Sequence, residues 1–229
     1  MIIGFSGIDL PQGKIKFHDQ KLINLVNKDN PKKISPYFFE FVLDNFIQSI
    51  AIIVPIDKIL DILIYDMETL ETRMQRTSNQ IETKLIEKCM NYLEQEIPLY
   101  DVSFDDSEKQ MLKLLSLTSM KPIVLLKEDE DINNIIFLAI EKAGYMFFYT
   151  SGIQESHAWL VPKGSDIITC ASKIHTDLAR GFIKGDVVKH QDYLDHHNFN
   201  ACKTKGVAKM VDKDYIVNPY EVIEIRFNV

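Results

Sequence analysis

The residues nearest the amino terminus that could do chemistry are two glycines and a lysine, Gly7, Gly13 and Lys14. A phosphate-binding loop needs Gly-x4-Gly-Lys-Ser/Thr, because its backbone amides wrap the phosphate and its hydroxyl holds magnesium. In this chain five residues separate the glycines, and Ile15 stands where the hydroxyl is required. No helical pattern follows at once, so an anion-binding helix amino terminus is also missing. The sequence therefore predicts that these residues do not bind a nucleotide.

A second polar group lies between Cys170 and Lys184, where a helical pattern changes to a strand pattern. The helical spacing is set by Ile167, Ile168, Ala171 and Ile174. From Phe182 the period is two, which places Ile183, Gly185 and Val187 on one face of a strand. His175 and Arg180 fall at the junction. His175 there either caps helix carbonyls or contacts a partner, and both interpretations remain open.

A third polar group contains five residues of types that bind metals, namely His190, Asp192, Asp195, His196 and His197. On a helix Asp192 and His196 would share a face, but the neighbouring histidines diverge by about 100°. We therefore predict no metal site and no cofactor. The three cysteines, Cys89, Cys170 and Cys202, are far apart and odd in number, which argues against a disulfide framework or a zinc site.

Size and charge limit the function classes. The chain has 229 residues and is 46% hydrophobic, enough for a sizeable core in one or two domains. No apolar run reaches membrane-spanning length and no secretory pattern begins the chain, so we expect a cytoplasmic protein without a membrane partner. The net charge is −7, with 16 basic and 23 acidic residues in 1–144 and 10 of each in 145–229. RNA binding would therefore need a local basic patch.

The periodicity predicts alternating strands and helices. Strands are expected at 1–5, 37–43, 50–54, 122–126, 146–150, 157–161, 215–217 and 222–227, and further helices at 18–26, 105–117, 132–142 and 193–198. Heptad spacing of Leu60, Leu63, Met67, Leu70 and Met74 predicts an antiparallel helical hairpin within about 57–97 that turns at 77–79. The fold class is therefore α/β (α+β), with a helical insertion in residues 1–144. Residues 145–229 form a sheet wrapped over one main helix, a β-grasp.

The carboxy-terminal motifs resemble a known family. Matching pieces are Phe148-Tyr-Thr-Ser-Gly152, Glu155-Ser-His-Ala-Trp159, Lys173-Ile-His-Thr-Asp177, Arg180-Gly-Phe-Ile-Lys184, Lys213-Asp-Tyr-Ile-Val217 and Arg226-Phe-Asn-Val229. In this order they are similar to the TGS-type β-grasp domain of the YchF, or Obg-like, P-loop NTPases. The resemblance implies a reduced P-loop-like α/β layer upstream, where Asp66-Met-Glu-Thr-Leu-Glu-Thr-Arg73 is similar to the entry of the family's coiled-coil insertion.

The family's nucleotide-binding motifs are degenerate or deleted here. After Val42 comes Leu43-Asp44-Asn45-Phe46, with no glycine to contact a γ-phosphate. Lys127-Glu-Asp-Glu130 lacks the asparagine of the family's base-reading Asn-x-x-Glu. Phosphoryl transfer depends on positioning by all these parts. We therefore expect a protein that does not hydrolyse nucleotide, although a diverged ATPase or GTPase with a remodelled pocket remains the alternative.

The resemblance also implies a partner, because TGS domains contact RNA. It predicts a binding or regulatory module that acts on the ribosome or a structured RNA. The candidate contacts are His175, Arg180, Lys184, Lys173 and Trp159, of which Trp159 either stacks on a base or anchors the sheet. A third interpretation has the helical hairpin docking a protein partner, as an adaptor.

Overall fold

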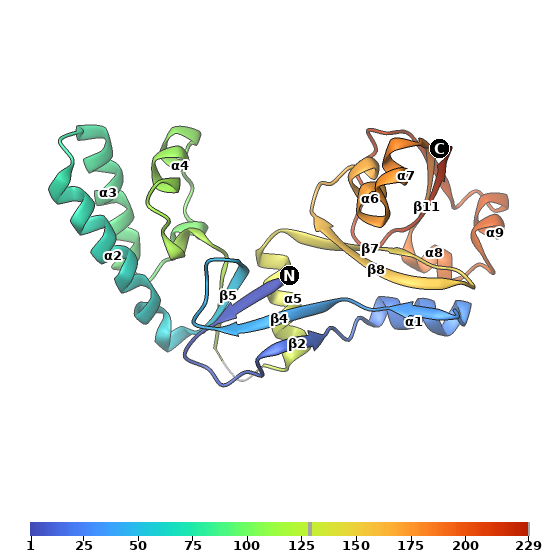
Figure 1. Cartoon of the computed structure of the whole chain (residues 1–229), viewed down its shortest axis with the longest axis horizontal. Helices are drawn as coiled ribbons and strands as arrows, with labels where there is room; N and C mark the ends of the chain where they lie inside the picture. The colour runs from blue at the N-terminus through green and yellow to red at the C-terminus, as the bar shows by residue number, and fades with distance from the viewer. Residues whose placement is uncertain (128–129, 229) are drawn as a thin grey trace. The chain divides into compact units, whose positions relative to one another are not determined.

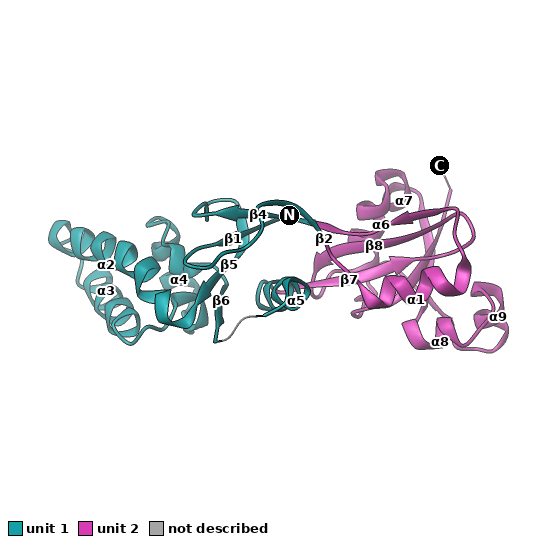
Figure 2. Cartoon of the chain, turned by 90° about the horizontal axis from the view of Figure 1, so that it is seen from below, with its two compact units in different colours: residues 1–15, 39–143 teal, residues 16–38, 144–229 magenta. Residues whose placement is uncertain are grey.

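The computed structural model describes residues 1–127 and 130–228, and these form two compact units (Figures 1 and 2). The first unit contains residues 1–15 and 39–143, and the second contains residues 16–38 and 144–229. The sequence had assigned the whole of 1–144 to one domain. In the structure, residues 16–38 belong instead with the carboxy-terminal unit. None of the helices in these ranges is long and apolar enough to span a membrane.

The first unit is built on a five-stranded sheet with the order β2-β4-β1-β5-β6. Its strands are β1 (Ile2–Phe5), β2 (Gly13–Lys16), β4 (Phe38–Leu43), β5 (Ser49–Pro55) and β6 (Ile123–Leu126). Its helices are α2 (Ile59–Arg76), α3 (Gln80–Leu93), α4 (Asp106–Lys113) and α5 (Ile132–Lys142), with 3-10 turns η1 (Ile56–Lys58), η2 (Leu99–Asp101) and η3 (Thr118–Met120). The expected strands and helices of this unit are therefore present, and β2 is an additional strand.

The central strands of this sheet are parallel and apolar. β1 pairs in parallel with β4 and β5, and β5 pairs in parallel with β6. Residues 51–54 of β5 are fully buried, as expected for a parallel strand covered on both faces. Ile52 and Val54 join the core cluster of the helical hairpin, while α5 packs against β5 and β6. The sheet is thus the base from which the hairpin projects.

The helical hairpin is confirmed, with α2 and α3 separated by residues 77–79. Asn79 begins α3, because its side-chain oxygen accepts from the backbone N–H of Ile81 at 2.9 Å. Leu70 and Leu85 lie in the apolar seam between the helices. Arg73 donates to Glu82 across the hairpin at 2.6 Å. The interruption of the heptads therefore marks a capped turn.

A short crossover connects β4 to β5 on the other side of β1. Parallel strands are usually joined by a dozen or more residues, often a helix, but here residues 44–48 suffice. The crossover lies against Gly4 of β1. A Cβ at Gly4 would lie 2.8 Å from Ser49 Oγ, 2.9 Å from Phe46 Cδ1 and 3.2 Å from Asn45 O. Only glycine leaves room for the crossover at this position.

The second unit is built on a six-stranded sheet with the order β10-β9-β11-β7-β8-β3. Its strands are β3 (Lys33–Ser35), β7 (Tyr145–Thr150), β8 (Glu155–Pro162), β9 (Phe182–Val188), β10 (Lys209–Val211) and β11 (Val222–Phe227). Its helices are α1 (Gln20–Asp29), α6 (Ile167–Ile174), α7 (Thr176–Arg180), α8 (His190–Leu194) and α9 (Phe199–Thr204).

The order and directions of these strands make a β-grasp. β7 and β8 form an antiparallel hairpin, and the last strand, β11, lies between them and β9, parallel to β7 and antiparallel to β9. α6 packs on this sheet through Ile167, Cys170 and Ala171, all fully buried. The mixed α/β fold expected from the sequence is therefore confirmed.

Three local expectations were wrong. The helix expected at 193–198 is replaced by α8 and α9, because Asn198 caps a new helix by accepting from Ala201 N–H at 2.9 Å. The strand expected at 215–217 is reduced to an isolated bridge between Ile216 and Asp166. In β9, Ile183 is 54% exposed although it was expected to share a face with Gly185 and Val187.

The exposure of Ile183 has a register cause. β11 places Arg226 opposite Lys184 and Phe227 opposite Phe182, so Ile183 has no residue opposite it. Ile183 is thus an extra residue in β9, which is a β-bulge. Before the bulge, the alternation of buried and exposed side chains along β9 is reversed. Phe182 therefore points into the core, where it is 7% exposed.

Candidate functional sites

The carboxyl ends of the parallel strands are where an open α/β sheet places a ligand. After β1, the Ser6 hydroxyl donates to the Asp44 carboxylate at 2.6 Å, and Asp44 directly follows β4. Gly7 has a φ of +70°, and a Cβ there would lie 3.1 Å from the Lys58 side chain. This edge is therefore lined by short contacts between the chain after β1 and the residues that follow β4 and β5.

Gly13 and Lys14 are the other two residues of the incomplete phosphate-loop pattern. Both lie in β2, and Lys14 is exposed. A phosphate loop leads into a helix whose amino terminus faces the anion, whereas here the chain continues as a strand. The base-reading stretch 127–130 includes residues 128 and 129, which lie outside the described residues.

His175 and Arg180 both contact Asp177. His175 separates α6 from α7: its backbone N–H donates to Ala171 O at 2.9 Å, and its Nδ1 accepts from Asp177 N–H at 3.2 Å. Arg180 forms an ion pair with Asp177 at 2.9 Å. The side chains of His175 and Arg180 are 62% and 71% exposed. His175 is thus a cap of two helices and also an exposed surface group.

The other candidate contacts differ in their partners and exposure. Lys184 forms an ion pair with Asp212, and Lys173 is exposed on α6. Trp159 is half-buried on β8, where its Nε1–H donates to Thr150 at 3.0 Å. The His157 ring stacks on Trp159 with centroids 3.5 Å apart. Trp159 is therefore held in the sheet, with one ring face occupied by His157.

Sequence reasoning missed a buried polar network in the second unit. Asp19 caps α1 by accepting from Lys21 N–H at 2.9 Å, and it also accepts from the Tyr149 hydroxyl at 2.8 Å. Burial is the main cause that raises the pKa of both Asp19 and Tyr149. The helix start at Asp19 is readable in the sequence. Its partner Tyr149 is not, because the two are distant along the chain.

His190 belongs to the same network. Its Nε2–H donates to the Lys21 carbonyl at 2.9 Å, and its Nδ1 has no hydrogen-bond partner among the described residues. Burial lowers the pKa of His190. At the other end of α1, Asp29 accepts from Ser151 at 2.6 Å and from Tyr193 at 2.9 Å. These bonds explain why residues 16–38 belong to the second unit.

The metal-type residues near α8 do not converge. His196 Nδ1–H donates to the Asp192 carbonyl at 2.7 Å, as a local helix contact. Within residues 1–127 and 130–228, no group of three or more His, Cys, Asp or Glu could hold a metal ion. Burial also raises the pKa of the Cys89 and Cys170 thiols to about 12, which keeps these groups protonated.

Comparison with known proteins identifies the relatives of this chain. Residues 145–228 match the model of the family YchF-GTPase_C, described as "Protein of unknown function (DUF933)". A Bacillus subtilis protein named "Ribosome-binding ATPase YchF" is 24% identical over 333 residues, covering 98% of this chain and 91% of that protein. A Haemophilus influenzae protein of the same name is 32% identical over 102 residues, covering 44% of this chain and 28% of that protein. This chain is a relative of the YchF proteins.

The structure of the Schizosaccharomyces pombe YchF GTPase has a similar fold. The TM-score is 0.75 at 18% identity, with 96% of this chain and 88% of that chain covered. The family resemblance expected from the motifs is therefore confirmed. The 333 aligned positions of the B. subtilis YchF protein exceed the 229 residues of this chain, so more than 100 of them are gaps here.

Proposed function

We propose that this chain is a ribosome-associated relative of YchF that does not hydrolyse nucleotide. The observation that carries the proposal is the path of the chain after β1. Gly13 and Lys14 lie in strand β2, and a crossover of five residues connects β4 to β5. Phosphoryl transfer needs a phosphate cradle, a metal ligand and a water-positioning group held together. The residues after β1 and β4 instead contact each other through Ser6 and Asp44.

The ribosome is proposed as the partner because of the names of two relatives. Proteins from B. subtilis and H. influenzae that align with this chain are named ribosome-binding ATPases. The part with the higher identity covers 44% of this chain, about the extent of the matched domain at 145–228. We infer that the carboxy-terminal unit is a TGS-like domain and that it makes the contact.

The surface of this contact is assigned to His175, Arg180, Lys184 and Lys173, with Trp159 on the neighbouring sheet. Four of these side chains can donate to phosphate oxygens, and His175 and Arg180 are well exposed. Asp177 and Asp212 partly neutralise them. Because the ion pairs are on the surface, exchange of a carboxylate for a phosphate costs little.

Co-sedimentation of the purified full chain with purified ribosomes at moderate salt tests this proposal. We expect the wild-type chain in the ribosomal pellet and the variant Lys173→Glu/Arg180→Glu/Lys184→Glu in the supernatant. The matched control Lys205→Glu/Lys209→Glu/Lys213→Glu reverses three charges of the same unit and should pellet like the wild type. Recovery of the wild-type chain in the soluble fraction alone would contradict the proposal.

Nucleotide binding is tested separately by the melting temperature with magnesium and ATP or GTP. A ligand at a hundred times its dissociation constant adds about 2.7 kcal/mol to the free energy of unfolding. We expect no change with either nucleotide. A clear rise with one of them would instead favour the alternative, a diverged ATPase or GTPase.

A further inference from the structure

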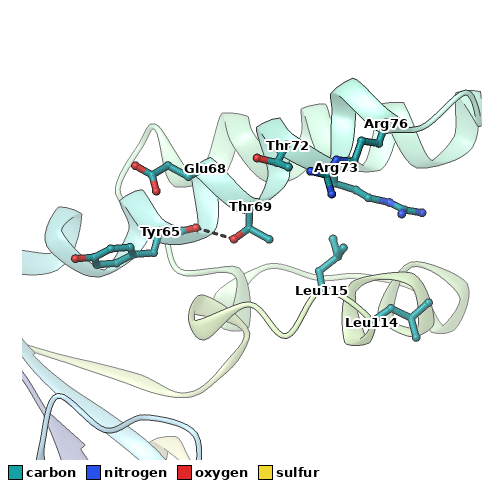
Figure 3. A pocket seen from close by; sticks show the side chains of 8 residues that line it. All are labelled: Tyr65, Glu68, Thr69, Thr72, Arg73, Arg76, Leu114 and Leu115. Carbon is teal, nitrogen blue, oxygen red and sulfur yellow. Dashed lines mark hydrogen bonds between the residues drawn. The ribbon is translucent and has the colours of Figure 1, made fainter.

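An open groove of about 580 Å³ runs along the helical hairpin (Figure 3). One wall is a single face of α2, made by Tyr65, Glu68, Thr69, Thr72, Arg73 and Arg76. These positions follow the spacing of three and four residues that places side chains on one side of a helix. The opposite wall is Leu114 and Leu115, which follow α4. All of these residues belong to the first unit.

The apolar residues of the groove are poorly covered. Leu114 is 84% exposed and Tyr65 is 68% exposed. Leu63 and Leu70, on the other side of α2, are fully buried in the hairpin core. The apolar seam between α2 and α3 therefore lies on the other side of α2 from the groove, and among the groove residues Arg73 bonds to Glu82 of α3. Leu114 and Tyr65 are thus large exposed apolar side chains that face one groove from its two walls.

The charge of the groove is uneven along its length. Arg73 and Arg76 lie at the carboxyl end of α2, while Tyr65 and Glu68 lie nearer its start. Arg73 uses its Nε–H for Glu82, which leaves its two Nη groups outside that hydrogen bond. Arg76 has no ion pair within the described part of the chain. The groove is therefore positively charged at the carboxyl end of α2, although the whole chain has a net charge of −7.

We infer that this groove docks an amphipathic helix of a protein partner, with apolar side chains against Leu114, Leu115 and Tyr65 and carboxylates against Arg73 and Arg76. The groove face of α2 spans about 16 Å at 1.5 Å per residue, which matches three turns of a helix. The leucines and Glu68 give an RNA backbone nothing to bind, whereas a leucine-rich helix with carboxylates at one end complements the leucines and the two arginines. This surface is separate from the one assigned to the ribosome.

Fluorescence anisotropy with the full chain tests the inference. The probe is a synthetic helical peptide of about 18 residues, with leucines at every third and fourth position and glutamates in one terminal turn. The comparison peptide carries lysines in place of the glutamates. We expect the acidic peptide to bind at least about tenfold more tightly, because two guanidinium groups meet its carboxylates.

Two groove variants should each weaken binding of the acidic peptide at least about tenfold, namely Leu114→Asp and Arg76→Glu. Their matched controls are Ile81→Asp and Lys84→Glu on the same hairpin, which lie outside the groove and should bind as the wild type does. Arg76 is the last residue of α2, so its replacement could also destabilise the helix. Binding is therefore compared only among variants whose melting temperature equals that of the wild type.

Three outcomes would overturn the inference. The first is no saturable binding of the acidic peptide, and the second is equal binding by the groove variants. The third is another occupant of the same face, shown by RNA binding that Arg76→Glu abolishes or by a dimer that Leu114→Asp dissociates. The peptide, RNA and dimer measurements do not use ribosomes. A failure of the proposed ribosome binding would therefore leave their outcomes unchanged.

Discussion

Asp66 connects the helical hairpin to η3 of the first unit through two hydrogen bonds. It is 4% exposed within α2, and its two carboxylate oxygens accept from the backbone N–H of Thr118 at 2.9 Å and of Ser119 at 2.6 Å. These amides begin η3, the turn that precedes β6. One buried carboxylate therefore satisfies two buried donors in a segment distant in sequence.

Replacement of Asp66 by alanine should lower the free energy of unfolding by about 1–3 kcal/mol, because two amide donors would lose their acceptor. Urea denaturation followed by circular dichroism measures this change. Glu71→Ala, at an exposed position of the same helix, is the control and should alter stability by about 0.5 kcal/mol or less. Equal stability of the two variants would show that water replaces the carboxylate.

His190 makes the second unit sensitive to acid. Burial lowers the pKa of His190 below its ordinary value of 6.5, and the facing groups Asp19 and Lys21 shift it in opposite directions. Below pH 6.5 the unfolded chain therefore binds this proton more readily than the folded chain. The free energy of unfolding should fall as the pH drops from 6.5 towards the folded pKa.

The variant His190→Gln keeps a donor for the Lys21 carbonyl but removes the titrating group. We expect a weaker loss of stability between neutral pH and pH about 5 than in the wild type, measured by urea denaturation at each pH. The exposed His197→Gln is the matched control and should follow the wild-type curve. Parallel curves for wild type and His190→Gln would contradict this role.

Among the elements, the crossover of residues 44–48 depends on one glycine. Gly4→Ala would place a methyl group within 3.2 Å of a backbone oxygen and closer still to Ser49 and Phe46. We expect a loss of about 1–3 kcal/mol, because the crossover must move away from β1. Thermal unfolding measures it against Gly152→Ala, where a Cβ meets nothing within 4 Å. A loss no larger than that of Gly152→Ala would mean that the crossover yields freely.

The sequence predicted most elements because their signals are local. Hydrophobic period and caps mark the hairpin turn at 77–79, helix α5 and strand β11, whose bounds agree with those expected. The division of 193–204 into two helices depends on a single cap at Asn198. The short strands β2, β3 and β10 were missed, because three or four residues that take their stability from neighbouring strands carry little pattern.

The candidate contacts were less predictable than the elements. The motif around His175 located an exposed joint, but nothing in it shows that Asp177 holds both His175 and Arg180. Lys184 and Trp159 bond to Asp212 and Thr150 on other segments, and these partners depend on packing across the sheet. Likewise, the groove combines one face of α2 with Leu114 and Leu115, which follow α4. The helical period predicts the face of α2, but it does not show which distant residues lie opposite.

For the whole molecule, the net charge of −7 limits how RNA can be bound. Each neutralised phosphate contributes about 0.7 to 0.9 to the slope of log affinity against log salt. With Lys173, Arg180 and Lys184 as the basic contacts, we expect a slope of magnitude about 3 or less. Co-sedimentation with ribosomes over a series of potassium chloride concentrations gives this slope. A magnitude near 8 would indicate a much larger basic surface and contradict the assigned patch.

The five-residue connection between β4 and β5 also has a kinetic consequence. Loop-closure entropy grows with the logarithm of loop length, so shortening a connection from about 12 residues to about 5 lowers its cost by just under 1 kcal/mol. β1 lies between β4 and β5, so once it pairs with one of these strands the short connection lowers the cost of adding the other. We expect substitutions in these strands to slow refolding, and substitutions in the hairpin seam to speed unfolding instead.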